Sequence, residues 1–184
     1  FKKLVGNFEF KPVLQEKPHG GKIAFVLPAV DIYGGGVNSV LRLADGLSKR
    51  GLEIYVVSLN ETDEEKINQN IAVCLGVTAV KGVCKNTFEC VKFDILIATA
   101  WQTAYYIYPF EGYKMYFVQD YEPYFYERGD FYYLAYKSYG LGYHMVSLGG
   151  WNKKKITENY PAAKVDEICF PFDPSVYGNI TRQK

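Results

Sequence analysis

Short apolar runs alternate along the chain with segments whose apolar residues recur every three or four positions. Residues 22–27 form an apolar run of strand length, which is typical of a strand buried on both faces of a parallel sheet. A loop over residues 28–36 leads into an amphipathic helix that ends before Gly51, where glycine favours a left-handed cap. The apolar face of this helix comprises Val37, Val40, Leu41, Ala44 and Leu47. With a second strand at residues 53–58, these elements predict a right-handed βαβ unit.

The alternation continues through the rest of the sequence. Strands are predicted at residues 71–74, 94–99, 113–118, 143–148 and 166–170, and helices at 64–70, 103–108, 132–139 and 151–159. This order predicts an α/β fold with a Rossmann-like, doubly wound, mostly parallel sheet in three layers. Residues 1–21 lack periodicity, so we expect an arm or linker there, with one short strand around residues 8–10.

The composition is that of an ordinary globular domain, except that many of its 17 Tyr and 12 Phe lie between residues 101 and 139. The length of 184 residues suits one domain. A formal net charge of +1 gives no electrostatic footprint for nucleic acid. The four cysteines show no Cys-x-x-Cys pair and no nearby His at ligand spacing, so we expect small buried hydrophobes and no metal site.

No apolar run approaches the roughly twenty residues that span a bilayer, and no signal peptide is evident. The sequence starts at Phe1 rather than Met, so we expect a piece of a longer, cytoplasmic protein that works at the inner face of the cell membrane.

Ligands bind at the carboxyl edge of a parallel sheet, so the loops after the strands are where chemistry is expected. These loops cover residues 28–36, 100–103, 119–130 and 149–151. In the first of them, Gly34, Gly35 and Gly36 stand at the start of a helix, where free backbone N–H groups and the helix dipole favour an anion. A flexible turn is the other interpretation of a triple glycine.

Two better-known phosphate motifs are excluded at this position. A P-loop requires Gly-Lys-Ser/Thr after its glycines, but Val37 and Asn38 follow Gly36. A dinucleotide-binding loop requires its glycines directly after the first strand, but six residues intervene here, and the second strand ends in Ser58 instead of an acid for a ribose.

Two stretches resemble a known family. Residues 22–28, followed by GGGVNSVLRLADGLSKRG at 34–51 and a valine-rich strand, look like the opening of GT-B glycosyltransferases of the group 1 kind. Residues 116–126, YFVQDYEPYFY, and 139–147, YGLGYHMVS, resemble the rhamnosyltransferases of the WsaF and rhamnan-synthesis type. The resemblance extends over residues 22–177.

The resemblance implies two Rossmann-like domains, with an acceptor held mostly by the N-terminal domain and a nucleotide-sugar donor mostly by the C-terminal domain. Residues 22–177 would be the acceptor-side domain, with the handover at 170–177 and a linker starting at 178–184. The activity implied is retaining, metal-independent hexosyl transfer without a cofactor, moving a sugar such as rhamnose from dTDP-rhamnose to a growing, lipid-linked cell-surface polysaccharide. Without the donor domain, its partner in the cleft, this chain is expected to be inactive.

Candidate site residues follow from both arguments. Backbone N–H groups of Gly35 and Gly36 would stabilise the charge that grows on the departing diphosphate. Asp120 is the candidate catalytic residue, as acceptor of the proton from the acceptor hydroxyl, although the relatives often have a histidine nearby. The predicted acceptor-binding residues are Trp101, Gln102, Thr103, Gln119, Tyr121 and Glu122.

Each of these roles has a structural alternative. Asp120 or Glu122 would otherwise cap the turn before Pro123, and Trp101 would otherwise belong to the core. The aromatic cluster over residues 121–139 is interpreted as packing in part and as an acceptor groove in part. His144 is expected to be a satisfied structural histidine, and the lysines at 153–155 a solvated face.

Two other functions stay open at this point. The first is a Rossmann-type enzyme with a nucleotide cofactor, and the second is a non-catalytic carbohydrate-binding α/β module. A second domain rich in βα units, with paired acidic residues, would favour the transferase.

Overall fold

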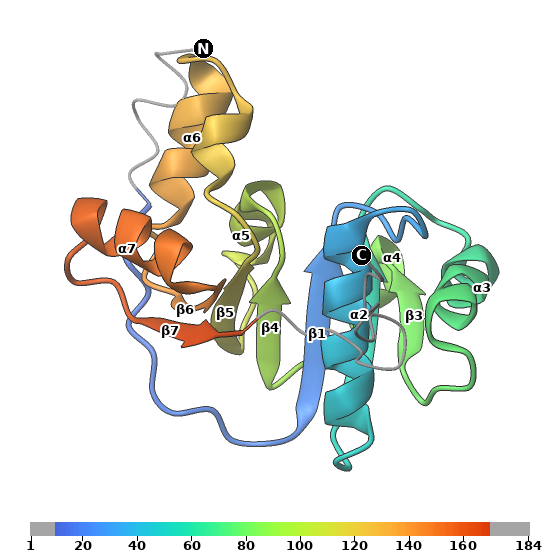
Figure 1. The fold of residues 1–184 in the computed structure, drawn as a ribbon. Helices are drawn as coiled ribbons and strands as arrows, with labels where there is room; N and C mark the ends of the chain where they lie inside the picture. The colour runs from blue at the N-terminus through green and yellow to red at the C-terminus, as the bar shows by residue number, and fades with distance from the viewer. Residues whose placement is uncertain (1–9, 170–184) are drawn as a thin grey trace, which may run out of the picture.

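The first strand, β1, lies near the middle of a seven-stranded parallel sheet in the computed structural model, which describes residues 10–169 (Figure 1). The strand order is β3-β2-β1-β4-β5-β6-β7. The strands are β1 (Lys22–Leu27), β2 (Glu53–Ser58), β3 (Lys81–Cys84), β4 (Ile95–Ala98), β5 (Tyr113–Val118), β6 (His144–Leu148) and β7 (Val165–Ile168). This confirms the α/β, Rossmann-like, doubly wound fold.

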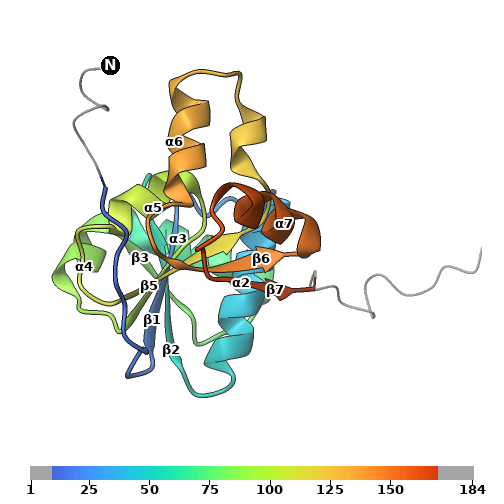
Figure 2. The same cartoon turned by 90° about the vertical axis from the view of Figure 1, so that its left-hand side faces the viewer.

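Helices cover both faces of this sheet and make the predicted three layers (Figures 1 and 2). They are α2 (Gly35–Ser48), α3 (Glu64–Leu75), α4 (Lys85–Cys90), α5 (Trp101–Ile107), the 3-10 helix η1 (Glu122–Phe125), α6 (Asp130–Ser138) and α7 (Gly150–Asn159). α2 and α3 pack on one face in one apolar cluster, and α4, α5 and α7 pack on the other face in a second cluster.

The first βαβ unit forms as its pattern of apolar residues predicts. β1 pairs with β2 in register from Lys22 opposite Glu53 to Leu27 opposite Ser58. α2 buries its predicted face on the sheet, and Gly51 has a φ of 88°, the left-handed conformation predicted for the cap.

The region after β2 differs from the prediction. Residues 71–74 were predicted as a strand, but they form the last turn of α3, because Ile67 and Ile71 are one helical turn apart and are both 1% exposed. The side chain of Asp63 caps the start of this helix by accepting from two backbone N–H groups. The strand in this region is β3, whose four residues are too few for a clear pattern of apolar residues.

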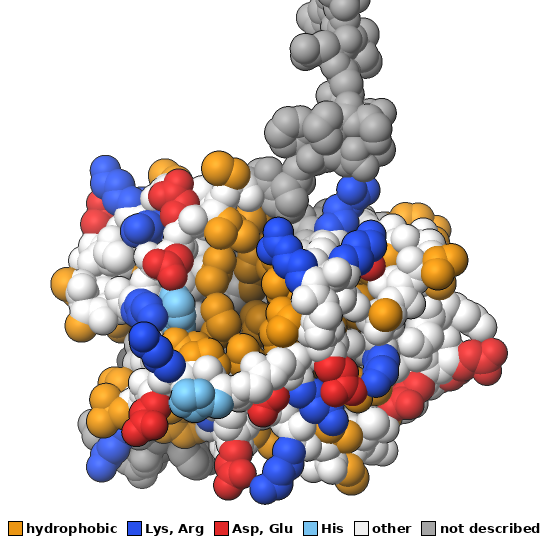
Figure 3. Space-filling view, turned by 90° about the horizontal axis from the view of Figure 1, so that it is seen from below, with side chains coloured by type: hydrophobic (Ala, Val, Ile, Leu, Met, Phe, Trp, Pro, Cys, Tyr) orange, Lys and Arg blue, Asp and Glu red, His pale blue; other side chains and the backbone are white. Residues whose placement is uncertain are grey.

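A shallow groove runs between α2 and the far part of the sheet. It has a volume of about 250 Å³, and Leu43 and Leu47 of α2 face Phe117 and Ile168 across it. Figure 3 shows apolar side chains gathered in a strip on this underside of the molecule. The groove marks where this face of the sheet extends beyond α2.

The predicted arm is described from residue 10 onward and contains no helix or strand over residues 10–21. It is held to the domain at two points: the Val13 N–H donates to the carbonyl of Leu141 in the turn before β6 (2.9 Å), and the Gln15 amide bonds both backbone groups of Lys114 in β5. The predicted strand at 8–10 and the handover at 170–177 lie mostly or wholly outside the described residues, as does the linker at 178–184.

Candidate functional site

The strand order places a topological switch point between β1 and β4, since the chain continues from β1 toward β2 and from β4 toward β5. In open α/β sheets, ligands bind in the crevice outside the carboxyl ends of the strands at this point. The loop after β1 leads to the start of α2 at Gly35, and the loop after β4 leads to the start of α5 at Trp101. Two of the predicted site segments therefore flank the switch point.

The start of α2 is open. Gly34 is the N-cap, and no described side chain caps the helix. The preceding loop is held by the Tyr33 N–H, which donates to the Asp31 carboxylate (2.9 Å), and by the Asn38 amide, which donates to the carbonyl of Gly34 (3.3 Å). Gly35 is exposed, and a Cβ on it would meet nothing within 4 Å. The first turn thus offers N–H groups beside open space, the geometry that binds anions.

Gly36 lies against Gln119 from the loop after β5. A Cβ on Gly36 would overlap the amide oxygen of Gln119 and lie 3.2 Å from its Cδ, so a larger residue here would require the flexible Gln119 side chain to move away from the helix start. The contact joins two motifs that are far apart in the sequence. It brings Gln119 to the side of the predicted diphosphate site.

Asp120, the candidate catalytic residue, has an exposed side chain. Its carboxylate accepts from the backbone N–H of Tyr121 (2.7 Å), and its carbonyl accepts from the hydroxyl of Tyr139 (3.4 Å). The carboxylate is oriented by the loop and remains accessible, which a general base requires. Its catalytic role stays a prediction.

Glu122 is buried, although it is only two residues away. Its exposed fraction is 8%, and its two oxygens accept from the Trp101 backbone N–H (3.0 Å) and from the hydroxyl of the fully buried Tyr116. Burial raises the pKa of Glu122 to about 7; the negative charge of Asp120 adds to this effect, and the two hydrogen bonds oppose it. The carboxyl therefore ties η1 to the start of α5 from within the core.

The three residues predicted after β4 have different surroundings. Trp101 is 8% exposed, and its indole N–H donates to the hydroxyl of Tyr126 (3.0 Å). Thr103 is fully buried, and its hydroxyl accepts from the N–H groups of Thr99 and Ala100, both at 3.0 Å. Gln102 is exposed. Of these three side chains, only Gln102 faces solvent.

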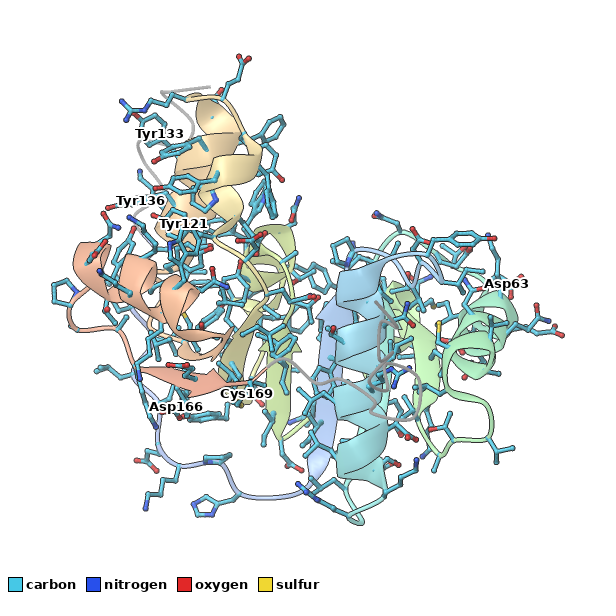
Figure 4. All side chains as sticks on the ribbon, viewed as in Figure 1. Asp63, Tyr121, Tyr133, Tyr136, Asp166 and Cys169 are labelled. Carbon is cyan, nitrogen blue, oxygen red and sulfur yellow. The ribbon has the colours of Figure 1, made fainter. Side chains whose placement is uncertain are left out.

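Tyr121 belongs to a buried aromatic stack. It is 3% exposed and stacks on Tyr139 at 5.5 Å between ring centroids, and Tyr139 stacks on Tyr116 at 5.7 Å. Figure 4 shows Tyr121 at the base of α6, beside α7. The stack supports the loop after β5 from below, so the packing interpretation holds for this part of the aromatic cluster.

Two exposed rings lie beside this loop, those of Tyr124 and Trp151, which the sequence placed in the aromatic cluster at 121–139 and in the loop at 149–151 but did not name as site residues. They are 59% and 52% exposed, and their centroids lie 6.1 Å apart. Asn152, the next residue after Trp151, holds the start of α7 in place, because its amide donates to the carbonyls of Gln119 (3.2 Å) and Leu148 (3.1 Å). The loop at 149–151 was among the predicted ligand loops, and its Trp was the available signal.

The remaining candidates lie elsewhere or are paired. His144 starts β6, at the opposite end of that strand, and bonds the hydroxyl of Tyr113 (3.0 Å) and the carboxylate of Asp166 (2.7 Å). Lys154 and Lys155 on α7 pair with Glu158 at 4.0 and 3.5 Å. Within residues 10–169, no three His, Cys, Asp or Glu side chains are grouped so that they could hold a metal ion.

Comparison with known proteins identifies a relative. Over 163 residues the chain is 31% identical to the O-antigen biosynthesis protein RfbC of Myxococcus xanthus, an alignment that covers 84% of this chain and 12% of RfbC. The chain thus spans about an eighth of the length of the relative that it matches. No protein-family model matches it.

Among the helices of residues 10–169, none combines the length and the apolar character that crossing a bilayer requires.

Proposed function

We propose that this chain is the acceptor-side, Rossmann-like domain of a two-domain GT-B glycosyltransferase that acts in the synthesis of a cell-surface polysaccharide. The observation that carries the proposal is the open start of α2 at the switch point, where Gly35 is exposed and Gly36 lies against Gln119, the neighbour of Asp120. The similarity to a protein named for O-antigen biosynthesis supports the class of product.

The chemistry follows from these groups. A nucleotide sugar loses its diphosphate as the glycosidic bond forms, and negative charge grows on the phosphate oxygens. Backbone N–H groups at Gly35 and Gly36 would bind those oxygens at the positive end of the α2 dipole. Asp120 would orient the acceptor hydroxyl and take its proton, while Gln119 and Gln102 would hold sugar hydroxyls.

The finer assignment rests on the sequence resemblance at residues 116–126 and 139–147. On that basis, the donor is a nucleotide-activated deoxysugar such as dTDP-rhamnose, transfer is retaining and needs no metal, and the acceptor is a lipid-linked saccharide. A second domain would supply most of the donor contacts, and the reaction would occur at the cytoplasmic face of the cell membrane.

The test is to replace Gly35 with Val in a polypeptide that joins this domain to its donor-binding domain. Since a Cβ at this position meets nothing within 4 Å, the fold should be unaffected. The added side chain fills the space where the diphosphate would lie, so sugar transfer should fall by about 100-fold or more, the loss expected when a stabilising donor is blocked. Transfer from a labelled nucleotide sugar and thermal unfolding are measured together.

Gly46→Val is the matched control, because Gly46 lies on the same helix and its added Cβ also meets nothing within 4 Å. It should leave transfer within about twofold, since it is remote from the helix start. Full transfer by a folded Gly35→Val variant would contradict the diphosphate contact, and absence of transfer by the unmodified two-domain protein would contradict the proposed function.

A further inference from the structure

Tyr124 and Trp151 form a small corner, named the aromatic corner below, on the sheet edge where the candidate site lies. Tyr124 stands on η1 and Trp151 in the first turn of α7. Their ring planes meet at 56° with centroids 6.1 Å apart, and about half of each side chain is exposed. Two large rings held at an angle with accessible faces are costly to leave in water, so a ligand that covers them is favoured.

The corner is held rigidly from behind. The buried ring of Tyr121 packs edge-on against Tyr124 at 4.9 Å and against Trp151 at 6.4 Å. The Tyr124 N–H also donates to the carbonyl of Tyr121 (3.0 Å). Asn152 anchors the first turn of α7 to the ends of β5 and β6 through two amide hydrogen bonds. Because both rings are fixed before a ligand arrives, little conformational entropy is lost on binding.

The position of the corner follows from the strand order. The start of α2 follows β1, Gln119 and Asp120 follow β5, and α7 follows β6. Along the carboxyl edge, the order is therefore the predicted diphosphate site, the candidate base, and then the corner. A molecule that presents a hydroxyl to Asp120 would extend over the corner with its next unit.

A sugar fits this surface better than a membrane does. Aromatic faces stack on the C–H face of a pyranose, while the amide and carboxylate groups on the same loop can bind its hydroxyls. Figure 2 shows η1 and α6 projecting together above the sheet edge, and Figure 4 shows Tyr121, which both rings of the corner contact, at the base of α6. The exposed segment that leads from η1 into α6 carries the charged residues Glu127, Arg128 and Asp130 between the exposed Phe125 and Phe131, and charged side chains are costly to bring into a bilayer.

We propose that the aromatic corner is a sugar-binding subsite, which stacks one pyranose unit of the saccharide acceptor next to Asp120. The proposal rests on the proposed function for its biological role. It moves the aromatic contact from Trp101, which is buried, to Trp151 and Tyr124, which are accessible.

The test measures binding of methyl glycosides to this chain by saturation-transfer NMR, with methyl α-L-rhamnoside, methyl α-D-mannoside and methyl β-N-acetylglucosaminide as probes. At least one probe should bind, with saturation strongest on the protons of one ring face. Trp151→Leu and Tyr124→Leu should each weaken binding about threefold to tenfold, the equivalent of one lost aromatic stack. Trp151→Phe should restore most of it, which a purely structural role of the side chain would not predict.

Phe131→Leu is the matched control. Phe131 is 59% exposed, as Tyr124 is, but its ring contacts Trp101 and Tyr126 instead of the corner, so binding should not change. The proposal is overturned if no probe binds, or if Phe131→Leu weakens binding as much as Trp151→Leu. It is also overturned if Trp151→Leu abolishes sedimentation with phosphatidylcholine–phosphatidylglycerol vesicles while no probe binds, since the corner would then be a membrane contact.

Failure of this proposal is distinguishable from failure of the proposed function. Glycoside binding that depends on the corner, in a protein whose unmodified two-domain form transfers no sugar, leaves the subsite and removes the proposed function. Loss of transfer in Gly35→Val without any glycoside binding does the reverse.

Discussion

The carboxyl edge of the sheet contains two regions of opposite accessibility. In one, made by Gly35, Gly36 and Asp120, the helix start has no side-chain cap and the carboxylate is exposed. In the other, made by Thr103 and Glu122, a hydroxyl and a carboxyl cap backbone N–H groups and are buried. Both regions follow strand ends and both belong to predicted site motifs.

The difference shows that a polar residue at a strand end is not available to a ligand when groups of the protein already satisfy its hydrogen bonds. Glu122 caps the start of α5 by accepting from the Trp101 N–H, the place that a ligand anion would otherwise take. The start of α2 has no such internal partner, and an external anion can take that place. The open region is therefore the one from which we expect ligand chemistry, and the closed region the one from which we expect stability.

The largest expected effect is on the closed region and concerns pH. The pKa of Glu122 is about 7 in the folded protein against an ordinary value of 4.5, so the folded state holds a proton that the unfolded chain releases between these values. Stability should fall as pH rises from about 4.5 to about 7, by on the order of 3 kcal/mol, and stay level above. Glu122→Gln, which mimics the protonated carboxyl, should remove this fall in urea unfolding curves measured from pH 4.5 to 8.

Glu64→Gln is a suitable control for that experiment, because the pKa of Glu64 is shifted in the opposite direction from that of Glu122. Hydrogen bonds from Thr87 and Cys84 lower the pKa of Glu64, so its contribution to stability is present at neutral pH and is lost as pH falls through the folded value. If the wild-type and Glu122→Gln curves run parallel over the whole range, the carboxyl does not titrate there and the comparison loses its electrostatic basis.

A smaller effect is expected at the other member of the closed region. Thr103→Val keeps the shape of the side chain but leaves the N–H groups of Thr99 and Ala100 without their acceptor. We expect a loss of about 2 kcal/mol in the free energy of unfolding. Thr157→Val should cost less than about 0.5 kcal/mol, because the Thr157 hydroxyl only donates a hydrogen bond to backbone carbonyls within α7, and its loss leaves no buried N–H without an acceptor. Equal losses of unfolding free energy in the two variants would show that the hydrogen bonds from Thr99 and Ala100 to the Thr103 hydroxyl do not stabilise the fold.

The smallest effect on stability is expected in the open region. Asp120→Asn keeps an oxygen that accepts from the Tyr121 N–H, so unfolding should change by less than about 0.5 kcal/mol. In the two-domain protein, sugar transfer to the acceptor should nevertheless fall by about 100-fold, since the proton acceptor is lost. Hydrolysis of the donor in the absence of acceptor should be less affected, and an equal effect on both reactions would argue against an acceptor-side role.

The periodic elements were predictable because their patterns are local. β1, α2 and β2 show their apolar runs and faces within a few residues, and β5 was predicted with the bounds that the structure has. The prediction was wrong at residues 71–74, where Ile71 is compatible with a strand or with one more turn of α3. Ile71 and Ile67 are buried together on the face of α3 that packs against the sheet, and this burial decides for the helix. The packing against β3 on which it depends cannot be read from neighbouring residues in the sequence.

By itself, the sequence determined the alternation of strands and helices and the glycine-rich helix start, because both are written in the spacing of neighbouring residues. Only the tertiary structure decided which strand-end residues face solvent. Glu122 accepts a hydrogen bond from the Trp101 N–H, 21 residues away in the sequence, and Gln119 packs against Gly36. Both contacts arise because the strand order brings these loops together at one edge of the sheet. Burial and hydrogen-bond satisfaction are set by neighbours in space, so the division of this edge into an open and a closed region appears only once the sheet is assembled.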